Sequence, residues 1–241
     1  MRALTAEDIL RAWELGQGRR LIDQGLLLLA LAVPEVSMTE LSHLPVGQRN
    51  AQLLALRQST LGAMAECLAV CPHCGASLEF SLDTANLATA HPVPRECQLV
   101  SGDYEVGFRL PNSLDLAAIA GCDDMSTARL MLIERCVLQA ACGSEAVAAQ
   151  DLPENVVLAL AAAMLEIDPD AELGLELDCS DCGHTWTTVF DVASFFWTEI
   201  KAQAKRLMRD VHTLARAYGW READILALSA TRRKFYLELS T

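Results

Sequence analysis

Four cysteines are arranged in two pairs of identical spacing. Each pair has two cysteines separated by two residues and followed by a glycine: Cys71-Pro-His-Cys74-Gly and Cys179-Ser-Asp-Cys182-Gly. This spacing lets both thiolates of a pair point at one cation, and the glycine permits the tight turn behind them. Four thiolates form the tetrahedral ligand set typical of structural zinc, with no coordination position left for water or a substrate. The pairs therefore predict a structural Zn²⁺ site with the ligands Cys71, Cys74, Cys179 and Cys182.

The two pairs are far apart in the chain, with 104 residues between Cys74 and Cys179. This gap is much longer than that of a compact zinc finger, so we expect either a zinc ribbon that carries a large inserted subdomain or a site that has been lost in some contexts while its hairpins remain. Three alternatives stay open on the sequence. An iron–sulfur cluster uses the same four thiolates, His73 or His184 could replace a cysteine as ligand, and a thioredoxin-like redox pair would need one Cys-x-x-Cys at the start of a helix.

The total cysteine count and the length of the apolar runs indicate the cellular compartment of the protein. An odd total of nine cysteines, without the pattern of a secretory signal, favours reduced thiols over a disulfide framework, and we expect a cytoplasmic protein. The longest apolar run, residues 26–33, is far shorter than the roughly 20 residues of a membrane-spanning helix. The cysteines outside the two pairs lie among apolar residues and are expected to be small buried side chains: Cys67, Cys97, Cys122, Cys136 and Cys142.

Composition limits the classes of function. A hydrophobic share of 52% over 241 residues is enough to bury a core. With 19 lysines and arginines against 32 aspartates and glutamates, the formal charge of −13 disfavours binding to nucleic acid phosphates. The histidines are scattered, and the sequence contains neither a nucleophile motif nor a phosphate-binding glycine loop. We therefore expect neither an enzyme nor a small-molecule substrate.

Hydrophobic periodicity predicts an α+β fold that is mostly helical, with a zinc-ribbon-like β element formed by the two distant cysteine turns. Thr5 and Asp8 have the spacing of a capping box at the start of the first helix, and Gly16 is its expected end. Helices are expected over 5–16, 20–32 and 47–61, near 113, 126 and 153, and over 195–218; strands are expected over 77–82, 98–110 as a hairpin, 172–177 and 184–189.

These elements predict three regions. The first is a helical region over residues 1–66. The second is a zinc-ribbon-like domain over 67–190, in which residues 92–170 form an inserted hairpin and helical subdomain. The third, over 191–241, is a long helix followed by short helices.

The carboxyl-terminal residues mix aromatic and basic side chains, which suits binding of a partner. A helix-turn-helix is one interpretation, with Arg232 and Arg233 contacting phosphates. A protein-docking surface is favoured, because the chain is acidic and because exposed aromatics beside arginines are typical of protein interfaces. The candidate partner-binding residues are Trp220, Arg232, Arg233, Phe235 and Tyr236.

The order of several motifs resembles the T4-family baseplate hub assembly chaperone-like proteins, which are encoded with contractile phages and phage-tail-like contractile injection systems. The resemblance is carried by Leu44-Pro-Val-Gly-Gln-Arg-Asn50, Cys71-Pro-His-Cys-Gly-Ala-Ser-Leu-Glu-Phe80, Phe108-Arg-Leu-Pro111, Cys179-Ser-Asp-Cys-Gly-His184, Phe190-Asp-Val-Ala-Ser-Phe-Phe-Trp197 and Ala217-Tyr-Gly-Trp-Arg-Glu-Ala-Asp-Ile-Leu-Ala-Leu-Ser229. It implies a non-enzymatic role in forming the baseplate, with hub, spike or other baseplate proteins as partners. The competing interpretation of the same residues is a zinc-ribbon regulator that binds nucleic acid.

Overall fold

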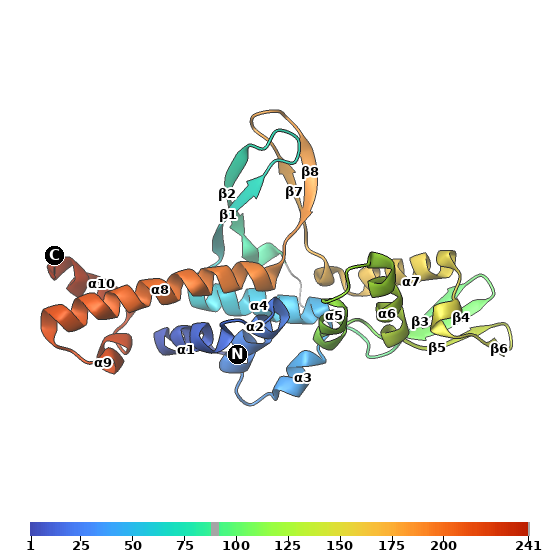
Figure 1. Ribbon diagram of the computed structural model, residues 1–241, viewed down its shortest axis with the longest axis horizontal. Helices are drawn as coiled ribbons and strands as arrows, with labels where there is room; N and C mark the ends of the chain where they lie inside the picture. The colour runs from blue at the N-terminus through green and yellow to red at the C-terminus, as the bar shows by residue number, and fades with distance from the viewer. Residues whose placement is uncertain (88–91, 241) are drawn as a thin grey trace.

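The computed structural model describes residues 1–87 and 92–240. It has mixed α and β structure and is mostly helical, as expected, with two hydrophobic cores and a pair of projecting β-hairpins. Figure 1 shows an elongated body with the helix α8 along it, a small sheet at one end, and the hairpins rising together from one side. Among the described residues, every helix is too short or too polar to cross a membrane.

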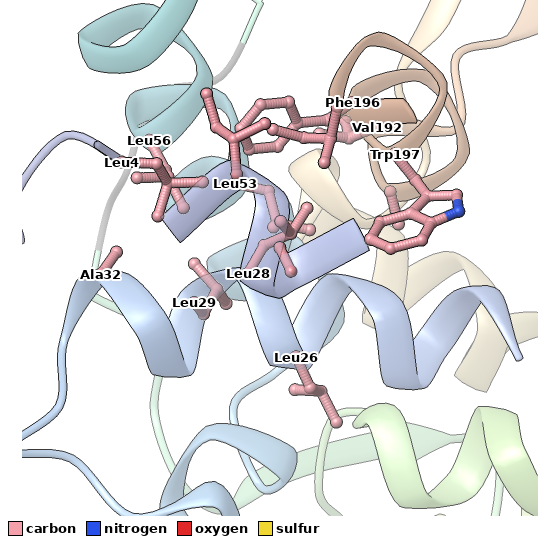
Figure 2. Close-up of a cluster of buried hydrophobic side chains, with 14 of the residues drawn as sticks. Leu4, Leu26, Leu28, Leu29, Ala32, Leu53, Leu56, Val192, Phe196 and Trp197 are labelled. Carbon is pink, nitrogen blue, oxygen red and sulfur yellow. The ribbon is translucent and has the colours of Figure 1, made fainter. Parts of the chain in front are cut away.

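The first core is built by helices from both ends of the chain. Its helices are α1 (Ala6–Gly16), α2 (Leu21–Ala32), the short α3 (Met38–Ser42), α4 (Val46–Leu61) and α8 (Val192–Tyr218). The expected capping box is confirmed: Thr5 Oγ1 accepts from the Asp8 N–H at 3.1 Å, and the Asp8 carboxylate accepts from the Thr5 N–H at 2.9 Å. Leu28, Leu53 and Phe196 are fully buried where α2, α4 and α8 meet (Figure 2).

The second core lies between a sheet and α7 (Glu154–Ile167). The sheet is antiparallel in the order β3 (Cys97–Ser101), β4 (Tyr104–Phe108), β5 (Val137–Cys142) and β6 (Glu145–Ala146). Pairing of Ser101 with Tyr104 confirms the hairpin expected over 98–110. The helices α5 (Ser113–Ile119) and α6 (Met125–Cys136) lie between β4 and β5 in the chain.

The two hairpins form what we call the stalk, residues 64–83 and 174–189. The first hairpin pairs β1 (Met64–Val70) with β2 (Ser77–Asp83), and the second pairs β7 (Gly174–Asp178) with β8 (Thr185–Val189). Short 3₁₀ turns flank the stalk and the second core: η1 (Thr84–Asn86), η2 (Ala149–Asp151) and η3 (Pro169–Ala171). The turns of both hairpins meet at the tip of the stalk, away from the helices (Figure 1).

Two buried contacts hold the base of the stalk. Arg57 on α4 forms an ion pair with Glu199 on α8 at 2.8 Å, and its guanidinium also donates to the Gly62 and Met64 carbonyls at 2.6 and 2.9 Å. At the other end of α4, the Gly47 N–H donates to the Asp168 carboxylate at 2.9 Å, just before η3. The strands β1 and β7 therefore start from opposite ends of one helix.

The chain ends in α9 (Glu222–Leu226) and α10 (Ala230–Leu239), which fold back on the last turns of α8. Ser229 caps α10 by accepting from the Arg232 N–H at 3.3 Å. The rings of Tyr218, Trp220 and Tyr236 pack together with centroid distances of 4.7 to 5.9 Å.

Candidate metal centre

The backbone of both cysteine turns follows one pattern. In the first hairpin the Cys71 N–H donates to the Ala76 carbonyl and the Gly75 N–H donates to the Cys71 carbonyl, both at 2.9 Å. In the second hairpin the Cys179 N–H donates to the His184 carbonyl, and the Gly183 N–H donates to the Cys179 carbonyl, again at 2.9 Å. Equal backbone geometry brings the two sulfurs of each pair to the same side of their turn.

The glycine of each turn is required by the backbone conformation. Gly75 has φ of 75° and Gly183 has φ of 71°, which is the left-handed region that side chains with a Cβ disfavour. A Cβ at either position would meet open space, so the requirement is conformational and is not caused by crowding.

The four sulfurs meet at the tip of the stalk. All four Sγ atoms lie within 4.8 Å of one another, and two of the separations, Cys74 to Cys179 at 3.6 Å and Cys71 to Cys182 at 3.8 Å, join the two hairpins. A disulfide would need about 2.05 Å, so these are separate thiols. Zinc–sulfur bonds of about 2.3 Å in a tetrahedron place the sulfurs about 3.8 Å apart. The cluster therefore fits one tetrahedral metal ion with small movements of the side chains.

The four thiols differ in burial, and hydrogen bonding gives two of them different pKa values. Cys71 and Cys179 are buried, whereas Cys74 and Cys182 are exposed. Desolvation opposes ionisation of Cys71, but the N–H groups of Cys74 and His73 outweigh it and lower its pKa to about 7. The His184 N–H favours the thiolate of Cys182, but desolvation and hydrogen bonds to the other three cysteines outweigh it and raise its pKa to about 12. Without metal the cluster retains protons, which a bound cation would displace.

The neighbouring histidines lie beside the cluster. The rings of His73 and His184 stack across the two hairpins with centroids 5.4 Å apart, and His184 also stacks on Trp186 at 6.1 Å. The group of side chains able to hold a metal within the described residues consists of the four cysteines, without either histidine. Both cysteine pairs lie in turns between strands, which is unlike the strand-to-helix position of a thioredoxin-like pair.

The remaining cysteines differ in burial. Cys67, Cys97 and Cys136 are buried as expected, while Cys122 and Cys142 are half-buried. Burial, followed by the charge of Asp115, raises the pKa of Cys136 to about 12.

The candidate partner-binding residues lie at the far end of α8 from the second core (Figure 1). Arg232 and Phe235 are exposed, and the rings of Trp220 and Tyr236 are half-buried against each other. Arg233 is buried, with its Nε 3.4 Å from the Asp210 carboxylate of α8. These five residues and the cysteine cluster therefore occupy separate places in the fold.

Sequence reasoning missed the residues that anchor the stalk. Arg57 is 2% exposed although it stands in an ordinary amphipathic helix pattern, and the turn residue Asp168 is 3% exposed. Their partners Glu199 and Gly47 lie 142 and 121 residues away in the chain. No local pattern in the sequence signals either contact.

Comparison with known proteins gives one match. The family model described as T4 bacteriophage base plate protein matches residues 29–197, which is 169 of the 241 residues. The matched range contains both cysteine pairs and the second core, and it ends in the second turn of α8. No curated protein and no solved structure matches the chain.

Proposed function

Because the chain belongs to the family of T4 bacteriophage base plate proteins, we propose that it helps to build the baseplate of a contractile tail or injection system. It would act at the hub as an assembly factor or as a structural component. Its partners in this proposal are hub, spike or other baseplate proteins. The match to a structural family also supports a non-enzymatic role.

The observation that carries the metal part of the proposal is the cluster of four sulfurs. We infer that Cys71, Cys74, Cys179 and Cys182 hold a structural Zn²⁺, since four thiolates leave no open position for catalysis. The bound ion would join two hairpins that leave the body at opposite ends of α4. A rigid stalk lowers the ordering cost of binding a partner.

The carboxyl-terminal residues are proposed as a docking surface. Phe235 is 58% exposed, and its ring lies 6.0 Å from that of the half-buried Tyr236, which also packs against the half-buried Trp220. Arg232 is exposed on the same helix and is available to a partner, whereas Arg233 would support the surface through Asp210. Aromatic rings beside arginines are enriched where proteins bind one another.

Metal analysis of purified protein tests the zinc site. We expect one zinc per wild-type chain and loss of most of the metal in Cys179→Ser, together with fewer complete baseplates in the producing cells. Cys122→Ser is the matched control, because Cys122 is half-buried and outside the cluster. Unchanged metal content in Cys179→Ser would refute the four-ligand site. If the purified wild-type protein contains iron and absorbs visible light, the four cysteines hold an iron–sulfur cluster and not zinc.

Copurification tests the assembly role. Retention of hub or spike proteins at high salt supports baseplate assembly. Salt-sensitive binding to duplex DNA that is lost in Arg232→Ala would instead favour the nucleic-acid regulator. Mass spectrometry of mature particles then separates the two forms of the proposal, since a structural component stays in the particle and an assembly factor leaves it.

A further inference from the structure

Charge is distributed unevenly along the chain. Residues 201–241 carry nine lysines and arginines against four aspartates and glutamates, a formal charge of +5. The first 200 residues carry ten against 28, a formal charge of −18. Surface charges farther apart than about 8 Å are largely screened at physiological salt. A binding partner therefore interacts with the local charge of each region and not with the net charge of −13.

One face of α8 concentrates the positive charge around an apolar side chain. Lys205, Met208, Arg209, His212 and Thr213 line a shallow hollow of about 580 Å³. Their spacing of three and four residues places them on one stripe of the helix. The buried side of this part of α8 carries other residues, including Ala204 and Leu207. We call this stripe the basic face.

The outer face of β1–β2 has the opposite charge and a larger apolar area. Met64, Leu68 and Val70 are 55, 67 and 59% exposed, and they alternate with residues that point to the other, more buried face. Glu66 and Glu79 lie on the same outer face, where Glu79 is directly opposite Leu68. The stalk segments 64–83 and 174–189 contain no lysine or arginine. Exposed apolar side chains gathered on one face beside polar residues are typical of an interaction surface.

The two faces carry opposite charges at similar spacings. Lys205 and Arg209 are four residues apart on a helix, with about 5–6 Å between their Cβ atoms. Glu66 and Glu79 are diagonal neighbours on adjacent strands, about 7–8 Å apart at Cα and somewhat closer at Cβ. Met208 lines the same hollow beside the two cations, as Leu68 lies beside the two carboxylates. We propose that the basic face of α8 binds the outer β1–β2 face of a second copy of this chain.

The contact has to form between two copies. Arg57 fixes the base of β1 to Glu199, and α8 continues from there as one helix, so neither face can swing onto the other. Among the described residues, no ion pair joins either cation to either carboxylate. Since each copy offers both faces, two copies can pair reciprocally in a two-fold dimer, or copies can join head-to-tail in a ring or an open chain. This inference deepens the assembly role and rests on it.

Sedimentation velocity of the full, metal-loaded chain tests the proposal. We expect the sedimentation coefficient to rise with protein concentration in about 50 mM salt and to lose that rise in about 500 mM salt. Lys205→Glu with Arg209→Glu should weaken association by about tenfold or more. Arg11→Glu with Arg19→Glu, at exposed positions on α1 and the loop after it, is a control with the same change in total charge.

A charge swap separates the specific contact from general repulsion. Glu66→Lys with Glu79→Lys should also fail to associate alone, yet an equimolar mixture with Lys205→Glu/Arg209→Glu should associate again. Circular dichroism and metal content confirm that each variant folds. A wild-type chain that stays monomeric at every concentration overturns the proposal, and so does association that persists in both variants. Binding of the basic face to duplex DNA by a monomeric chain also overturns it. Copurification of hub or spike proteins is a separate readout of the assembly role, so the two proposals fail distinguishably.

Discussion

Replacing Arg57 with methionine removes the charge that ties the stalk to the helical core. The guanidinium is almost completely buried, and it donates to both carboxylate oxygens of Glu199 at 2.8 and 2.9 Å and to the Gly62 and Met64 carbonyls. Removing one partner of a buried ion pair costs about 3–5 kcal/mol. Because the Glu199 side chain keeps 24% exposure, water offsets part of the loss, and we expect the free energy of unfolding to fall by about 3 kcal/mol.

Urea unfolding of the metal-loaded protein measures this change. Arg129→Met is the matched control, since the Arg129–Glu154 pair is 42% and 68% exposed and should cost less than about 1 kcal/mol. Hydrogen exchange should also become faster in residues 64–83 of Arg57→Met, while α2 keeps its protection. A loss for Arg57→Met no larger than that of Arg129→Met would refute the assignment of Arg57 as the anchor of the stalk.

Three further predictions concern packing, pH and metal. Gly47→Ala should destabilise the protein by about 2 kcal/mol or more in the same urea assay, because the added Cβ would lie 1.9 Å from Asp168 Oδ1. Gly121→Ala is the control and should leave the stability nearly unchanged, because a Cβ at this position has no neighbouring atom. Burial opposes ionisation of Asp115, but hydrogen bonds from Arg109, the Asn112 N–H and Arg135 outweigh it and lower its pKa from the ordinary 3.8. The ionised carboxylate therefore stabilises the fold above about pH 3.8, and this stabilisation is lost as the pH falls through the lowered pKa. The stability of Asp115→Asn should fall less steeply with decreasing pH than that of the wild type, and identical acid-unfolding curves would contradict this. Chelation of the metal should first speed hydrogen exchange in both hairpins, while the helical circular dichroism signal is largely kept. If the exchange protection of the hairpins and the helical signal are lost together, the metal also stabilises the helical core.

Local chemistry explains what the sequence could predict. The cysteine pairs, the Thr5 capping box and the long helix depend on spacings of a few residues, and the structure has the cysteines clustered and the other two features in place. The strand β1 was not expected, because its apolar residues at 64, 68 and 70 face outward. The strand β5 was not expected either, because it follows α6 at residue 137 without a glycine or proline between them.

Long-range packing explains what the sequence could not predict. The first helix ends at Gly16 as expected, but Gly16 has no positive φ, and its role is to leave room for the Trp197 ring that lies against it. A Cβ at Gly16 would be 2.1 Å from that ring. The ion pair of Arg57 likewise depends on a residue far along the chain. The division into regions 1–66, 67–190 and 191–241 stays a prediction.

The separation of the cysteine pairs also sets an order of events during synthesis. The first pair leaves the ribosome 104 residues before the second, which is roughly 5 to 20 s at ordinary rates of translation. The second core draws its residues from 97–167 and can fold within that interval. The first core cannot, because Phe196, Trp197 and Ile200 come from α8. The helices α1, α2 and α4 therefore lack the α8 part of their core until α8 has been synthesised, after both cysteine pairs.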